Sequence, residues 1–220
     1  MATSYSELVT NIQNASENDG SEFALAIPVF IDQTRMRLAR DVDTYGLVTY
    51  TTVTLASSTP LVSVPSDTLV LKAVTHVSAG TYSQLIMRTD EFLREYWPVR
   101  SNTGTPKYYA RWSYNQLLLA PAPESNSQVE FSYVQIPTSI GPVGTSTNWL
   151  TDFAPEAFFY GCMSEACMFM KNYAAAALWE AKYQDAVSKL RNEARRTRQD
   201  DNLNNSSPAG GDNTMAPGGL

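Results

Sequence analysis

Hydrophobic residues recur at helical spacing at both ends of the chain and at strand spacing between them. Near the start, Leu8 and Ile12 lie one helical turn apart. They follow Ser4 and Glu7, which have the spacing of a capping box. This pattern predicts a short helix that ends near Asn14.

A second helical stretch is predicted after a turn at residues 17–20. Ser21 can cap a turn over residues 22–26, and Pro28 fits the first position of a longer helix, where its missing N–H costs nothing. The residues that share one face of that helix are Phe30, Ile31, Thr34 and Leu38.

The hydrophobic period changes to two between residues 47 and 137, which is typical of β-strands. A short helix at 90–97, ended by Pro98, is the one exception. We expect an antiparallel sheet or a small sandwich inserted between helices. The predicted strands are 47–55, 61–64, 69–78, 82–88, 107–113, 116–120 and 128–136.

The final part returns to helical spacing, with helices predicted at 155–171 and 174–198. Their predicted buried stripes are Phe159, Cys162, Met163, Ala166 and Met170 in the first helix, and Trp179, Tyr183, Ala186 and Leu190 in the second. The predicted fold class is α+β. We expect N-terminal helices within 1–46, a β-domain at 47–150, C-terminal helices at 151–198 and a long tail at 199–220.

Charge is sparse and unevenly distributed. Charged residues make up 17% of the chain, against about 25% in an average soluble protein. The net charge of −6 combines −7 over residues 1–188 (11 basic, 18 acidic), +4 over 189–198 and −3 over 199–220. An acidic body argues against a dedicated nucleic-acid binder. The basic segment at 189–198 could be a solvated helix end, could bind an acidic partner surface, or could contact nucleic acid. The tail at 199–220 is rich in Asn, Gly, Pro and Ser, and it is predicted to be disordered in the free protein.

Few side chains could perform chemistry or hold a metal or cofactor. The chain has one histidine and two cysteines, and its Gly141–Gly144 segment lacks the Lys of a phosphate-binding loop. His76 is expected on a strand, facing solvent or a sheet neighbour. Cys162 and Cys167 would point about 140° apart on one helix, which predicts small core residues rather than a disulfide.

Two further residue groups admit a functional interpretation. Asp41 and Asp43 could flank a glycosidase cleft, although such acids are also common at polar helix ends. The aromatic residues of the β-part could form core and cross-strand pairs, stack on sugars as in a carbohydrate-binding module, or line a subunit interface. These aromatics are Trp97, Tyr108, Tyr109, Trp112, Tyr114, Phe131 and Tyr133.

The chain has no run of about 18 apolar residues and no basic, then apolar leader at its start. We therefore expect no membrane association. The protein is expected to stay in the cytoplasm where it is made, or to leave by a route other than a signal peptide.

Several segments, in the same order, resemble the head-to-tail adaptor (connector) proteins of tailed bacteriophages, particularly short-tailed ones. The resemblance covers about residues 4–191. The segments that carry it are YSELVTNIQNASENDGSEFALAIPVFI at the start, RDVD (40–43), REYWP (94–98), PKYYARW (106–112), LLLAPAP (117–123), VEFSYVQIP (129–137), APEAFFYG (154–161) and KYQDAVSKL (182–190).

The resemblance implies a non-enzymatic virion protein without cofactors. Such adaptors have a helical bundle made from N- and C-terminal helices, with a β-domain inserted between them. Many copies, typically a dodecamer, form a ring between the portal protein and the tail nozzle or tail tube protein. Genome DNA passes through the ring without sequence-specific binding. The C-terminal segment commonly reaches the portal, and the residues expected to dock there are Lys189, Arg191, Arg195, Arg196, Arg198, Leu203, Met215 and Leu220.

Overall fold

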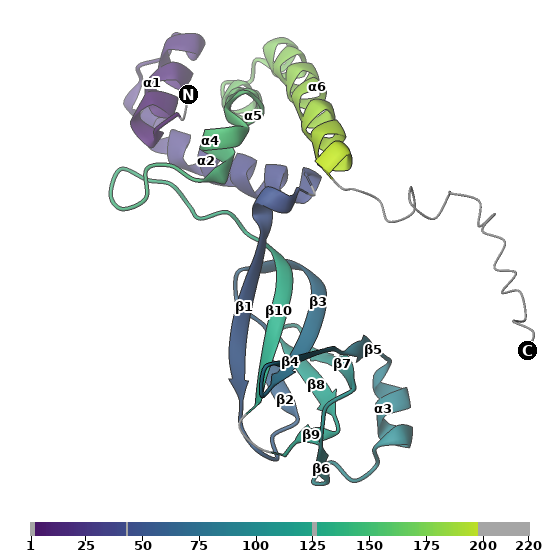
Figure 1. Cartoon of the computed structure of the whole chain (residues 1–220). Coiled ribbons are helices and arrows are strands. Elements are labelled where there is room, and N and C mark those ends of the chain that lie inside the picture. The colour runs from purple at the N-terminus through teal and green to yellow at the C-terminus, as the bar shows by residue number, and fades with distance from the viewer. Residues whose placement is uncertain (1–2, 43, 125–126, 198–220) are drawn as a thin grey trace, which may run out of the picture.

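The computed structural model describes residues 3–42, 44–124 and 127–197, and over these residues the α+β prediction is confirmed. Figure 1 shows two parts. One contains the helices from both ends of the chain, which we call the helical region. The other contains the strands between Val48 and Gln135, which we call the β-region.

The helical region has one hydrophobic core to which all of its helices contribute. Its largest fully buried side chains include Phe23, Phe158 and Tyr183, one from each of the three longest helices. The helices are α1 (Tyr5–Ser16), α2 (Ser21–Asp41), α4 (Trp149–Phe153), α5 (Pro155–Phe169) and α6 (Tyr173–Thr197).

The start of α1 confirms the predicted capping box. The Ser4 side chain accepts a hydrogen bond from the Glu7 backbone N–H, and the Glu7 carboxylate accepts one from the Ser4 backbone. Both Leu8 and Ile12 are buried, as the helical spacing predicted. Two of the N–H groups that a helix start leaves without partners are thereby satisfied.

The prediction that Pro28 begins a helix is wrong. It lies inside α2, which begins seven residues earlier at Ser21. A proline in a helix interior costs about 3 kcal/mol through a lost hydrogen bond and steric clash. Burial of Phe23 and Ile27 before the proline, and of Phe30 and Ile31 after it, offsets this cost. The predicted buried face of Phe30, Ile31, Thr34 and Leu38 is confirmed.

The β-region consists of two four-stranded sheets. The first has the order β1 (Val48–Leu55), β10 (Ser127–Gln135), β3 (Thr68–Ser78) and β4 (Thr81–Gln84), all antiparallel. The second has the order β2 (Leu61–Ser63), β8 (Gln116–Ala120), β7 (Tyr108–Ser113) and β5 (Ile86–Met87), with β5 parallel to β7. The pair β6 (Thr103–Gly104) and β9 (Ala122–Pro123), the short helix α3 (Asp90–Tyr96) and a 3-10 turn (Tyr45–Leu47) complete the described elements.

A second hydrophobic core fills the space between these sheets. Phe131 and Val74 come from the first sheet, and Leu117 and Leu119 come from the second. A smaller cluster joins Leu93 of α3 to the other face of β7 and β8. The two regions therefore each have their own core.

The single strand predicted at 82–88 is in fact two strands in different sheets. Residues 81–84 pair with β3, whereas residues 86–87 pair with β7. Leu85 lies between them with its side chain buried, and its N–H donates to the Val74 carbonyl oxygen. The chain changes sheets at this residue, so a single stretch of strand-like sequence contributes to both.

The two regions are connected by the segments that lead into β1 and out of β10. Gly46 lies so close to the Trp149 indole that a Cβ there would be 2.1 Å from the ring nitrogen. Arg35 of α2 donates a 2.6 Å hydrogen bond to the carbonyl oxygen of Pro137, which follows β10. These contacts hold both connecting segments against the helices.

Gly161 of α5 lies against side chains of both α2 and α6. A Cβ at this position would be 2.4 Å from the Thr34 methyl group and 3.2 Å from the Tyr183 ring. Thr34 and Tyr183 are fully buried, so neither can move aside without disturbing its own packing. Glycine is therefore required here by space rather than by backbone conformation.

We expect Gly161→Ala to lower the free energy of unfolding by about 1–3 kcal/mol, the usual cost of overpacking a core. The loss should appear even though alanine is the better helix former by about 1 kcal/mol. Urea unfolding followed by circular dichroism would measure it. Gly141→Ala is the matched control, because a Cβ there would meet its nearest atom at 3.7 Å. Equal stability of the two variants would contradict this account of Gly161.

Candidate functional site

Arg37 lies at the centre of a charged cluster between three helices, which we call the Arg37 junction: Arg37, Asp41, Glu165, Glu180 and Tyr183. From α2, Arg37 forms ion pairs with Glu180 of α6 and, at 3.7 Å, with Glu165 of α5. Its guanidinium carbon lies 4.2 Å from the centroid of the Tyr183 ring. A single side chain thereby contacts charged or aromatic partners on both neighbouring helices.

The electrostatics of the junction favour the charged forms of Arg37 and Glu180. Burial opposes ionisation of Glu180, but hydrogen bonds from Arg37 and Gln184 hold the pKa of its carboxyl group below the ordinary value. Burial and the neighbouring Asp41 carboxylate raise the pKa of the Tyr183 phenol. Tyr183 therefore stays protonated and donates a 2.7 Å hydrogen bond to Asp41.

Asp41 is occupied by contacts to α6. Besides the Tyr183 bond, its backbone oxygen accepts a 2.7 Å hydrogen bond from Arg191, whose guanidinium also lies 3.7 Å from the carboxylate. These contacts fasten the end of α2 to the middle and the last third of α6. Asp43, the other acid of the hypothesised glycosidase pair, lies outside the described residues.

The basic end of α6 lies beside the end of α2, close to where the chain enters the β-region (Figure 1). Lys189 pairs with Asp185 at 2.7 Å, and Arg191 binds Asp41. Arg195 and Arg196 are exposed and form no ion pair within the described part of the chain. The remaining predicted docking residues, Arg198, Leu203, Met215 and Leu220, lie outside the described residues.

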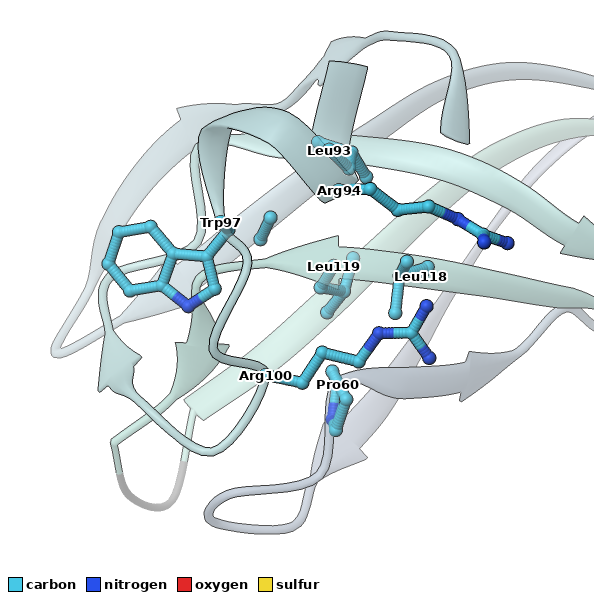
Figure 2. Close-up of a pocket in the computed structure, with 8 residues that line it drawn as sticks. Pro60, Leu93, Arg94, Trp97, Arg100, Leu118 and Leu119 are labelled. Carbon is cyan, nitrogen blue, oxygen red and sulfur yellow. The ribbon is translucent and has the colours of Figure 1, made fainter. Parts of the chain in front are cut away.

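A second cluster of cations and aromatic rings lies on the β-region, around α3. Arg100 and Arg94 lie with their guanidinium carbons 4.6 and 6.0 Å from the centroid of the Trp112 ring. Both also line a small pocket, and Figure 2 shows their guanidinium groups on the same side of it, away from Trp97. The other residues that line this pocket are Pro60, Leu93, Trp97, Leu118, Leu119 and Ala120.

Sequence reasoning missed the two arginines of this cluster. Arg94 is on α3, whereas Arg100 comes after Pro98, within a turn in which the Asn102 N–H donates to the Val99 oxygen. The turn brings the two guanidinium groups to the same tryptophan. Residue spacing alone contained no signal of this convergence.

The aromatic residues divide between core and surface. Tyr109, Phe131 and Tyr133 are buried, as the core interpretation predicted. That interpretation is wrong for Trp112, which is 38% exposed, and for Tyr114, which is 93% exposed. Trp112 lies near the end of β7, and Tyr114 lies in the turn that leads to β8. The partly buried Tyr108 packs edge-on against Phe92 and Tyr96 of α3.

His76 lies on a strand, as expected, and of its two expected surroundings the structure shows sheet neighbours rather than solvent, because the side chain is buried on β3. It lies between Val129 of β10 and Ser83 of β4. Its Nε2 atom has no hydrogen-bond partner among the described residues. Burial lowers the pKa of the imidazole, because the charged form would lose its hydration.

Both cysteines are buried and unpaired with each other, as the helix geometry predicted. Burial raises the pKa of the Cys162 thiol to about 12, so it is not a nucleophile at neutral pH. Within the described ranges, no three His, Cys, Asp or Glu side chains converge as metal ligands would. Every helix in those ranges is too short or too polar to span a membrane.

Comparison with known protein families gives a match over nearly the whole chain. A family model described as SU10 adaptor protein matches residues 3–209, which include every described helix and strand. A search of curated proteins finds no match.

We expect Arg37→Gln to lower the free energy of unfolding by about 1–2 kcal/mol, since it leaves the partly buried Glu180 carboxylate without its cation. Solvent screening keeps this below the cost for a fully buried pair. Arg40→Gln, an exposed position on the same helix, is the matched control. Urea unfolding at neutral pH would measure the free energy of unfolding of both variants. Equal values for the two would show that the ion pairs of Arg37 do not stabilise the fold.

His76 should make the protein less stable in mild acid. The unfolded chain binds a proton as the pH falls through about 6.5, whereas the buried imidazole resists protonation, so the free energy of unfolding must fall. The slope can reach about 1.4 kcal/mol per pH unit. Urea unfolding at pH 7.5, 6.5 and 5.5 should show this loss in the wild type but not in His76→Leu. Parallel profiles for the two proteins would refute it.

Proposed function

The chain belongs to the SU10 adaptor protein family, a family of phage head-to-tail adaptors, and we propose that it acts as the ring that joins the portal protein to the tail nozzle or tail tube protein. In this proposal about twelve copies surround a channel for the genome DNA. The protein is then a non-catalytic part of the virion. The family match over residues 3–209 is the observation on which the proposal depends.

We propose that the helical and β-regions are separate domains with separate tasks. The helices of residues 1–46 and 151–198 would form the bundle, and residues 47–150 the inserted domain. Two observations support this division. Each region has its own hydrophobic core, and the chain passes between them only along the segments that flank β1 and β10.

Exposed apolar side chains on the helical region support lateral contact between copies. Leu25 is 80% exposed, and Val29 lies one turn further along the same helix. Exposed apolar clusters of this kind are typical of protein–protein contact sites. The other large exposed apolar residues of this region are Phe153, Met168, Phe169, Tyr173 and Leu178, together with Val143 in the connecting segment.

The portal contact is proposed at the basic end of α6 and the residues that follow it. Arg195 and Arg196 are the most available cations, because Lys189 and Arg191 already bind acids of the same chain. Arginine pairs well with carboxylates, so an acidic portal surface is the partner that suits them. The acidic body would let DNA pass without binding, since like charges repel.

A carbohydrate-binding β-module is the second candidate, and the exposure of Trp112 and Tyr114 is the observation in its favour. Against it, the Arg100 guanidinium lies 4.6 Å from the Trp112 ring centroid, where a sugar would have to stack. The assembly experiment below distinguishes the two candidates, because a carbohydrate-binding module is not expected to form rings with a portal.

Deletion of residues 199–220 should leave the fold intact and weaken portal attachment. The fold should survive because both cores and all described elements end by residue 197. Circular dichroism would test the fold. Negative-stain imaging and mass photometry of mixtures with purified portal would count adaptor rings seated on portals.

The full-length chain mixed with the same portal preparation is the control. Unchanged co-assembly of the truncated protein would remove the tail from the portal contact. Failure of the full-length chain to form rings would overturn the proposed function itself.

A further inference from the structure

Strand β1 has an unprotected outer edge. It pairs with β10 along all eight of its residues and with no other described strand. Its sequence, VTYTTVTL, contains no charged residue and no proline. Soluble proteins usually protect an edge strand with charge, proline, a bulge or a covering segment, because its free N–H and C=O groups can pair with another chain. None of the backbone groups of β1 has a described hydrogen bond outside its own sheet.

Strand β4, at the opposite edge of the same sheet, has the same character. Its residues are TYSQ, again without charge or proline, and all four are exposed. The edge strands of the second sheet are shorter, since β2 has three residues and β5 has two. The first sheet therefore has two neutral, strand-length edges that face away from each other.

The strand directions match what a ring requires. The four strands alternate in direction, so β1 and β4 run antiparallel to each other. In a ring all copies have the same orientation, so the β4 of one copy would approach the β1 of the next in the antiparallel sense. A sheet with an even number of alternating strands can therefore continue from copy to copy without a break in its pattern.

The register within the sheet identifies which residues would meet. Thr54 of β1 pairs with Gln128 of β10, and Gln128 pairs with Val77 of β3. Val77 in turn pairs with Tyr82 of β4, so all four residues lie at the same level across the sheet. Without a shift along the strands, Tyr82 of one copy would thus face Thr54 of the next. The same steps place Gln84 opposite Thr52. All four residues are exposed and uncharged, so their juxtaposition brings no like charges together.

We propose that β1 of one copy pairs with β4 of the neighbouring copy, so that the first sheets of adjacent subunits form one continuous sheet around the assembly. This inference rests on the proposed ring. It names the edges through which the β-regions contact each other. A β1–β1 pair about a two-fold axis and an added strand from another protein are the competing occupants of the edge.

Cysteine cross-linking tests the pairing directly. The double variant Thr54→Cys/Tyr82→Cys should form disulfide-linked ladders up to the full ring when rings assembled with portal are mildly oxidised. Directly opposed antiparallel residues have Cα atoms about 4.5–5.5 Å apart, within disulfide reach. The control Tyr50→Cys/Tyr82→Cys moves one cysteine four residues along the strand, about 14 Å away. We expect at least tenfold more linked product from the first variant.

Each outcome decides between the occupants. Rings that form normally but give no ladder, or equal ladders from both variants, would overturn the β1–β4 pairing and leave the proposed function standing. Linked dimers from Thr54→Cys alone would assign the edge to a β1–β1 pair and would likewise overturn it. If the unsubstituted protein forms no rings with portal, the proposed function fails and this pairing fails with it. Both substituted positions are exposed, and the native cysteines are buried, so the wild type should give no ladder.

Discussion

The chain enters the β-region on β1 and leaves it on β10, and these two strands are hydrogen-bonded to each other along their length. Entry and exit therefore lie side by side, and the helices on either side of the insertion can pack as if the chain were continuous. Residues 5–41 and 149–197 share one core despite the hundred or so residues between them. The Arg35 bond to Pro137 and the close fit of Gly46 against Trp149 hold the two connecting segments against the helices. Without this antiparallel pair, neither region would have a defined position relative to the other.

The position of α6 depends on two further contacts within the helical region. Gly161 allows α5 to approach both α2 and α6, and the Arg37 junction then fixes how α6 lies along that contact. Arg191, bound to the end of α2, aligns the last turns of α6 with the entry to the β-region. Arg195 and Arg196 lie about one turn beyond Arg191, the residue that binds the end of α2. Under the proposed role, a basic helix end fastened in this way to α2 would favour one direction of docking.

Local patterns predicted most of the helices and strands, and failed where the outcome depended on distant partners. The spacing of Leu8 and Ile12 after a capping box was enough for α1, since each signal acts within a few residues. The prediction for Pro28 failed because the local rule places proline at a helix start. In the structure, buried residues on both sides of Pro28 stabilise a helix that continues across it. The stretch 82–88 is strand-like throughout, and only the fold determines that Leu85 ends one sheet and begins another. The convergence of Arg94 and Arg100 on Trp112 depends in the same way on a turn that no residue spacing encodes. The acidic pair and all of the expected portal-docking residues remain predictions.

The two free edges of the first sheet also bear on how assembly would proceed. Subunits with one open strand edge on each side can add to one another in a linear series. Under the proposed pairing, any open oligomer, whatever its length, keeps one β1 edge and one β4 edge without a partner strand. Closing the circle removes both at once. Under the proposed pairing, the contact that closes the ring would be more favourable in free energy than each earlier one. It forms between two ends of the same oligomer, where the effective concentration of the edges is high. Complete rings would then dominate over partial arcs. Because neither edge strand is charged, this preference should respond only weakly to ionic strength.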